Sequence, residues 1–160
     1  MTVIINPIQP TDDSEIGAII KAVGAEFGAI GEGFGPSDPE VDAMSQSYTL
    51  DKQSLYLVAT IDGKIVGGCG LAPFNHSQQT CELKKLFLLP ESRGLGLGKQ
   101  LTELCLEFAT QQGFSECYLD TLTSMKSAIS LYEKLGFTHL EQPLDGTEHS
   151  SCDVWMLKKL

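Results

Sequence analysis

Between a predicted strand and a predicted helix lies the sequence Arg93-Gly94-Leu95-Gly96-Leu97-Gly98-Lys99. Its alternating glycines allow backbone angles that a Cβ atom would forbid, and they let the chain approach a ligand closely. The backbone N–H groups that open the following helix have no partner inside that helix, and the helix dipole favours an anion beside them. We therefore interpret this stretch as an anion-binding loop.

Two cations accompany the loop, and both favour phosphate. Arg93 is the only arginine of the chain, and a planar guanidinium suits phosphate oxygens. Lys99 adds a second positive charge. A P-loop is excluded because it would need glycine at position 93 and Ser or Thr at position 100, where Gln100 stands. A dinucleotide fingerprint starting at Gly94 is excluded because Lys99 occupies its last glycine position.

The hydrophobic period changes several times along the chain, which is typical of a mixed α/β domain. Asp62-Gly63 between two apolar runs predicts a tight two-residue hairpin with positive φ at both positions. The pattern predicts strands over 3–8, 55–61, 64–71, 80–89, 117–122, 137–140 and 152–158. It predicts helices from residues 12–14 to the glycines that start at residue 28, and over 39–47, 97–112 and 126–135. We expect a single domain over residues 1–160.

Charge and cysteine content restrict the partners and the compartment. The net charge of −10 argues against nucleic acid, whose binding needs a basic face. The five cysteines form no C-x-x-C pair, so we expect buried thiols, a reducing cytoplasm and no metal site. No apolar run approaches the ~20 residues of a membrane span, and the first residues do not resemble a secretion signal.

The motif Arg93-x-x-Gly96-x-Gly98 resembles the pyrophosphate loop, [Q/R]-x-x-G-x-[G/A], of the GNAT superfamily of acetyl-CoA-dependent N-acetyltransferases. Residues 86–91 look like the fourth strand of that superfamily with its Pro-Glu exit. Residues 128–137 look like its A-x-x-L-Y-E-K-L-G-F helix and turn. The tail with His149 resembles a small bacterial branch that ends in H-S-x-C-x-V-W-M. The resemblance implies a mixed, mostly antiparallel sheet of about seven strands flanked by about four helices.

The resemblance also implies which residues bind acetyl-CoA as co-substrate. The backbone of Leu86 and Leu88 would pair with the pantetheine arm, and the N–H groups of residues 95–98 would hold the pyrophosphate. Many relatives carry Asn where this chain has Met125, so we expect only packing there. The expected cofactor contacts are Leu86, Phe87, Leu88, Arg93, Gly94, Leu95, Gly96, Leu97, Gly98, Lys99, Met125 and Ala128.

Two residues are catalytic candidates by resemblance. Tyr132 would place its hydroxyl near the thioester sulfur and protonate the departing thiolate; the alternative is an aromatic anchor for its helix. Glu82 stands where the histone-acetylating branch carries its general base; the alternative is a solvated strand residue. Strand alternation predicts that Glu82, Lys84, Leu86 and Leu88 share one face.

The acceptor half of the site is expected from variable loops. Residues 26–36, with Phe27 and Phe34 among glycines, are expected to cover the substrate. His149 could bind substrate or relay a proton, but we favour an idle surface residue. The predicted activity is acetyl transfer by direct attack of an amine, a small molecule rather than a protein, with homodimerisation possible. The alternatives are a non-catalytic acyl-CoA-binding module of the same fold and an unrelated nucleotide-binding regulator.

Overall fold

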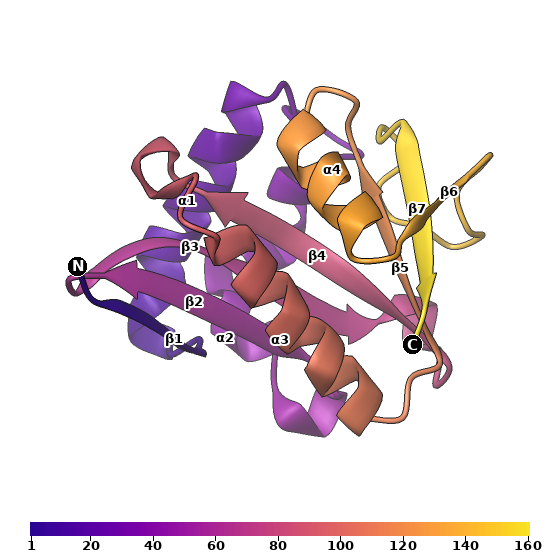
Figure 1. Ribbon diagram of the computed structural model, residues 1–160, viewed down its shortest axis with the longest axis horizontal. Coiled ribbons are helices and arrows are strands. Elements are labelled where there is room, and N and C mark those ends of the chain that lie inside the picture. Colours follow the sequence, from indigo (N-terminus) through magenta and orange to yellow (C-terminus); the bar gives the residue numbers. More distant parts are fainter.

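Seven strands form one sheet in the order β1-β2-β3-β4-β5-β7-β6 in the computed structural model, which describes residues 1–160 (Figure 1). All neighbouring strands are antiparallel except β4 and β5, which are parallel. The strands are β1 (Val3–Pro7), β2 (Leu55–Ile61), β3 (Lys64–Pro73), β4 (Thr80–Leu88), β5 (Glu116–Thr121), β6 (Thr138–Leu140) and β7 (Val154–Lys159). The α-helices are α1 (Asp13–Glu26), α2 (Met44–Ser47), α3 (Leu97–Gln111) and α4 (Lys126–Lys134). The predicted fold class is confirmed.

The sheet separates two hydrophobic cores (Figure 1). On one face α3 buries Leu101, Cys105 and Ala109, which recur at helical spacing against the sheet. On the other face α1 buries Ile16 and Ile20 in the same manner. Four of the five cysteines are buried, as their apolar surroundings predicted.

The parallel pair β4 and β5 diverges along its length, and this opens the middle of the sheet. The two strands pair only from Thr80 opposite Glu116 to Glu82 opposite Tyr118. Beyond Glu82, β4 continues to Leu88 with no strand on its β5 side. An edge of this kind offers backbone groups to an extended ligand.

A bulge at Lys85 reverses the faces of β4. Lys85 has φ 54°, and the register against β3 shifts at this point. Before the bulge Leu83 belongs to the α3 core; after it Leu86 and Leu88 pack against that same core. Glu82 therefore lies on the opposite face from Leu86 and Leu88. The prediction that Glu82, Lys84, Leu86 and Leu88 share one face was wrong for Leu86 and Leu88. Strict alternation along a strand assumes that the strand has no bulge.

The hairpin turn has the conformation that the sequence predicted, and one predicted helix is partly a 3-10 turn. Asp62 and Gly63 have φ 49° and 82°, which confirms the two-residue hairpin. The helix predicted over 39–47 is a 3-10 turn (Pro39–Ala43) followed by α2.

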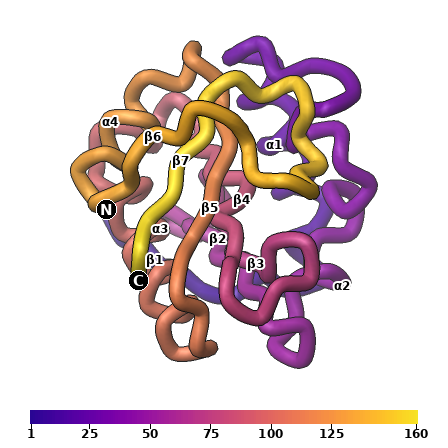
Figure 2. Tube along the Cα trace, turned by 90° about the vertical axis from the view of Figure 1, so that its right-hand side faces the viewer, coloured from indigo at the N-terminus to yellow at the C-terminus, as the bar shows by residue number.

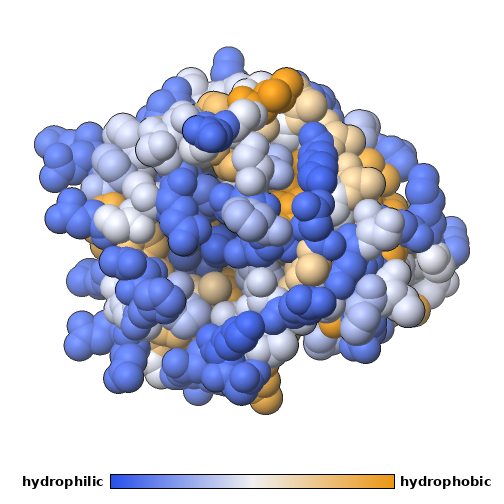
Figure 3. All heavy atoms as spheres, turned by 180° about the vertical axis from the view of Figure 1, so that it is seen from behind, coloured by the Kyte–Doolittle hydropathy of each residue, from blue (hydrophilic) through white to orange (hydrophobic).

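Hydrophilic side chains cover most of the face seen in Figure 3, in line with the net charge. None of the helices has the length and apolar character needed to span a bilayer.

Candidate active site

The glycine loop presents unpaired backbone amides at the start of α3. Gly94 and Gly96 have φ 78° and 79°, a region that residues with a Cβ rarely adopt, and Gly96 is the N-cap of the helix. No N–H group from Gly94 to Lys99 donates to a backbone carbonyl; the first that does is that of Gln100, to Gly96 O at 3.1 Å. The amides are free to bind an anion.

A groove of about 560 Å³ runs from this loop along the free edge of β4 to the start of α4. Lys99 and Lys134 line it, and neither is ion-paired to a carboxylate. Leu95 does not line it and is 44% exposed at the loop tip. The other predicted cofactor residues line the groove: Leu86, Phe87, Leu88, Arg93, Gly94, Gly96, Leu97, Gly98, Lys99, Met125 and Ala128.

Arg93 reaches this groove with most of its N–H groups already engaged. Its Nε and one terminal nitrogen donate to Leu88 O at 3.1 and 2.9 Å. Its two terminal nitrogens bind the Glu26 carboxylate at 2.6 and 2.8 Å, and the guanidinium lies over the Phe27 ring. Arg93 therefore ties the end of α1 to the end of β4, and Phe27 lies in the groove instead of the substrate pocket.

A second, smaller pocket opens off the groove between the diverging strands. Leu86, Phe87 and Met125 line both cavities, so the two join at these residues. Phe34 lines the smaller pocket, where a substrate-covering residue was predicted. Glu82 lines it as well.

Tyr132 is buried in the wall of the smaller pocket, and its hydroxyl has no protein partner. It is 6% exposed, packs against Phe137 with ring centroids 5.7 Å apart, and lines the smaller pocket. No protein group hydrogen-bonds its hydroxyl. Burial raises the pKa of Tyr132, so the phenol stays protonated at neutral pH and can donate a proton.

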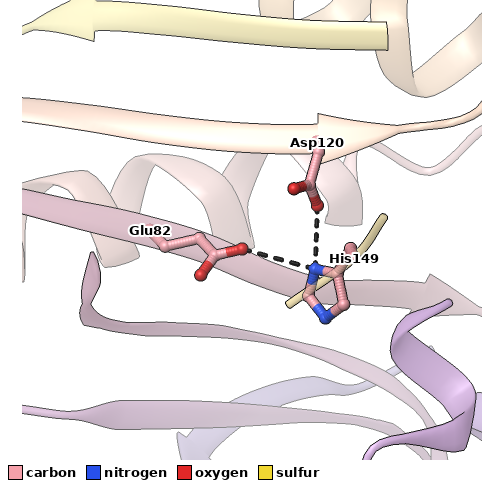
Figure 4. Close-up of side chains that lie close together, drawn as sticks. All are labelled: Glu82, Asp120 and His149. Carbon is pink, nitrogen blue, oxygen red and sulfur yellow. Dashed lines mark hydrogen bonds and ion pairs between the residues drawn. The ribbon is translucent and has the colours of Figure 1, made fainter. Parts of the chain in front are cut away.

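His149 lies at the other end of the pocket among three carboxylates (Figure 4). Its Nδ1 is 2.8 Å from Asp120 Oδ1 and 3.5 Å from Glu82 Oε2, and its Nε2 is 2.8 Å from Asp38 Oδ2. Burial alone would lower the pKa of His149, but its interactions with the carboxylates of Asp120, Asp38 and Glu82 outweigh this effect and raise the pKa to about 11. The expectation of an idle surface histidine was wrong, because the residue is 6% exposed and charged.

Asp38 connects His149 to a buried lysine. Lys85 Nζ lies 2.7 Å from Asp38 Oδ2 and 3.0 Å from Glu40 Oε2, and its side chain is 1% exposed. Burial alone would raise the pKa of Asp38, but His149 and Lys85 outweigh it and lower the pKa to about 2. Glu40 also accepts a hydrogen bond from Tyr48. The charges of this network are thus held in fixed positions behind the pocket.

Two loops far apart in the sequence meet over the pocket, and Figure 2 shows the 141–153 loop against the segment near residue 33. Ser151 N donates to Gly33 O at 3.1 Å, and Ser151 Oγ donates to Glu32 O at 3.0 Å. A Cβ atom at Gly33 would collide with Ser151. The predicted covering segment, residues 26–36, therefore closes the pocket jointly with the His149 loop.

Replacing His149 with alanine is expected to lower the free energy of unfolding by about 3 kcal/mol, because it leaves the buried Asp120 carboxylate without a cation and Asp38 with Lys85 alone. Urea unfolding would measure the change. The pKa of His149 is about 11 in the folded protein and 6.5 in the unfolded chain. The stabilisation that protonated His149 provides is therefore complete below pH 6.5 and is lost as the pH rises through 11. The exposed Asp145→Asn on the same loop is the control; an alanine variant as stable as this control would contradict the network.

Glu82, Asp120 and His149 bring one donor atom each within 4.8 Å of one another, a spacing that a metal ion could use. The raised pKa of His149 favours an imidazolium at this place at neutral pH. An imidazolium has no free nitrogen lone pair to ligate a metal. The absence of a metal stays a prediction.

Sequence reasoning missed Asp38, Asp120 and Lys134. Asp120 had a usable signal, since it is the one charge inside an otherwise buried strand segment, Cys117–Leu119 and Thr121. Asp38 was interpreted only as part of a loop before a helix. Its contact with His149 spans 111 residues, and no local pattern predicts a contact of that range.

Comparison with known proteins gives consistent matches. The model of the acetyltransferase (GNAT) family matches residues 25–137. An Escherichia coli protein, the uncharacterized N-acetyltransferase YjgM, is 40% identical over 151 residues, which cover 93% of this chain and 90% of that protein. A GNAT-family acetyltransferase of Staphylococcus aureus superposes with a TM-score of 0.86 at 21% identity, covering 99% of both chains. The acetyltransferase yncA of Salmonella typhimurium, solved with its cofactor acetyl-CoA, gives 0.79 at 20% identity, covering 100% of this chain and 95% of that one.

Proposed function

The chain belongs to the GNAT family of N-acetyltransferases, and we propose that it transfers the acetyl group of acetyl-CoA directly to a small amine, with Glu82 as base and Tyr132 as acid. Glu82 and Tyr132 both line the pocket that joins the groove. The observation that carries the proposal is that a groove with free backbone amides joins a pocket that holds a carboxylate and a phenol, neither of which has a hydrogen-bond donor or acceptor in the protein.

The groove fits the chemistry of acetyl-CoA. The free amides of residues 94–99 and the dipole of α3 suit a diphosphate, and the unpaired ammonium groups of Lys99 and Lys134 add positive charge. The partnerless edge of β4 beyond Glu82 suits the amide-bearing pantetheine arm. For Arg93 to contact phosphate, the exposed Glu26 carboxylate would have to give way.

Glu82 is placed to take a proton from the acceptor. Its side chain is 10% exposed, lines the pocket and accepts no hydrogen bond from the protein. An alkyl ammonium has a pKa near 10.4, so its nucleophilic form costs about 4–5 kcal/mol at pH 7. His149 cannot act as the base at this pH, because it is already protonated. Glu82, directly or through a water, is therefore the proposed general base.

Tyr132 is placed to serve the leaving group. Its protonated hydroxyl has no protein acceptor and faces the pocket at the junction, where the groove would bring a thioester. Donation of its proton to the departing thiolate sulfur would leave coenzyme A as a thiol and the amide as product.

Tyr132→Phe is expected to lower kcat by about 10²-fold while the affinity for acetyl-CoA is unchanged. Because the hydroxyl has no protein partner, its loss should change the free energy of unfolding by less than about 0.5 kcal/mol. Thiol release from acetyl-CoA over a panel of amines, with wild type and variant side by side, measures the effect. Equal losses in turnover and coenzyme affinity would instead assign Tyr132 to packing; no release with any amine would refute the proposed reaction.

A further inference from the structure

The charges around the acceptor pocket do not cancel. Lys84, Lys85 and His149 are the cations, and His149 is protonated at neutral pH. Four carboxylates face them, so one negative charge remains: Asp38, Glu40, Glu82 and Asp120.

The ion pairs show which carboxylate carries the surplus negative charge. Lys85 is shared by Asp38 and Glu40, and Lys84 Nζ lies 3.5 Å from Glu40. Asp120 is satisfied by His149 at 2.8 Å and by the hydroxyls of Tyr118 and Thr147 at 3.2 and 2.5 Å.

Glu82 is the carboxylate that carries this surplus charge. It accepts no hydrogen bond, its one cation within 4 Å is His149 at 3.5 Å, and it is 8% exposed. A buried carboxylate in this condition gains from a ligand that brings a positive charge and N–H donors.

The rest of the pocket offers no unpaired cation to a negative group, since His149 is already ion-paired with Asp38 and Asp120. Both lysines that line it are tied to carboxylates, and the other walls include Ala29, Phe34 and Leu119. Its volume of about 60 Å³ corresponds to roughly four to six waters. A carboxylate bound here would lie near Glu82 and Asp120 with no free cation to compensate it.

Building on the proposed function, we propose that the acceptor is a small amine that enters as a monocation and carries no carboxylate, with its ammonium group received by Glu82. This excludes free amino acids of similar size as preferred acceptors. Larger acceptors would have to open the contact between Ser151 and Gly33 that closes the pocket.

The test compares amines of nearly equal basicity that differ in one group. Propylamine is paired with β-alanine, and butylamine with 4-aminobutanoate, and kcat/KM is measured by thiol release. We expect the plain amine of each pair to exceed the amino acid at least roughly tenfold, because like charges repel in a buried site. Glu82→Gln, measured at alkaline pH, should reduce this ratio, whereas Asp145→Asn should keep it.

Calorimetric titration with acetyl-CoA, run beside the assay, separates a failure of the acceptor class from a failure of the proposed reaction. A ratio near one, or a preference for the amino acids, would overturn the acceptor class while leaving the acetyltransferase intact. If the protein binds acetyl-CoA but acetylates no amine of either kind, both the acceptor class and the proposed reaction fail.

Discussion

Glu82→Gln is expected to lower kcat/KM for an amine acceptor by about 10²–10⁴-fold at pH 7, with acetyl-CoA affinity unchanged. Glutamine keeps the shape of the side chain and removes its ability to take a proton. The side chain does not line the groove next to the glycine loop, so coenzyme binding does not depend on it directly, and its ion pair with His149 at 3.5 Å is shared with the closer Asp38 and Asp120.

The pH dependence sharpens this prediction. Without a base the variant relies on free amine, whose fraction rises about tenfold per pH unit until the amine pKa near 10.4. The rates of wild type and variant should therefore converge at alkaline pH. Glu148→Gln, an exposed carboxylate on the neighbouring loop, is the matched control and should behave as wild type. A glutamine variant that keeps more than half of the activity at pH 7 would remove Glu82 from the mechanism.

Gly96→Val is expected to lower acetyl-CoA affinity by about 10²–10⁴-fold, the loss of roughly two charge-assisted hydrogen bonds. The φ of 79° at Gly96 is strained for a β-branched residue, so the loop would change its backbone angles and move its amides off the phosphates. A Cβ at this position would meet no atom within 4 Å, so steric collision is not the cause.

Gly113 provides the control for this substitution. It follows the same helix at its other end, has φ 88°, and also has open space around its Cβ position. Gly113→Val should therefore suffer similar strain, about 1–3 kcal/mol of stability, and keep its coenzyme affinity. Circular dichroism and calorimetry on both variants separate folding from binding. Equal coenzyme affinity in the two valine variants would contradict the role of the loop.

Local sequence patterns predicted the elements and the position of the glycine loop before α3 well. The strand over residues 55–61 has the predicted bounds, because a continuous apolar run and an Asp-Gly turn are both signals that extend over only a few residues. The loop before α3 was recognisable for the same reason, since its glycines and the following helix are contiguous. The groups proposed to bind the diphosphate are backbone amides, and the conformation of this backbone follows from local sequence.

The acceptor side was less predictable because distant segments build it. Lys85, at the bulge, forms ion pairs with residues 38 and 40, and the bulge reverses the face expected for Leu86 and Leu88. His149 resembled a loop histidine until the fold placed it beside Asp38 and Asp120. The engagement of Arg93 by Glu26 joins residues 67 positions apart and was not expected either.

The central claim is that the amides opening α3 hold the diphosphate of coenzyme A. Isothermal titration of the purified protein with coenzyme A tests it most directly. We expect saturable binding of one coenzyme per chain. The affinity should fall as ionic strength rises, because much of the interaction is electrostatic. A trace that stays flat up to millimolar coenzyme would contradict it.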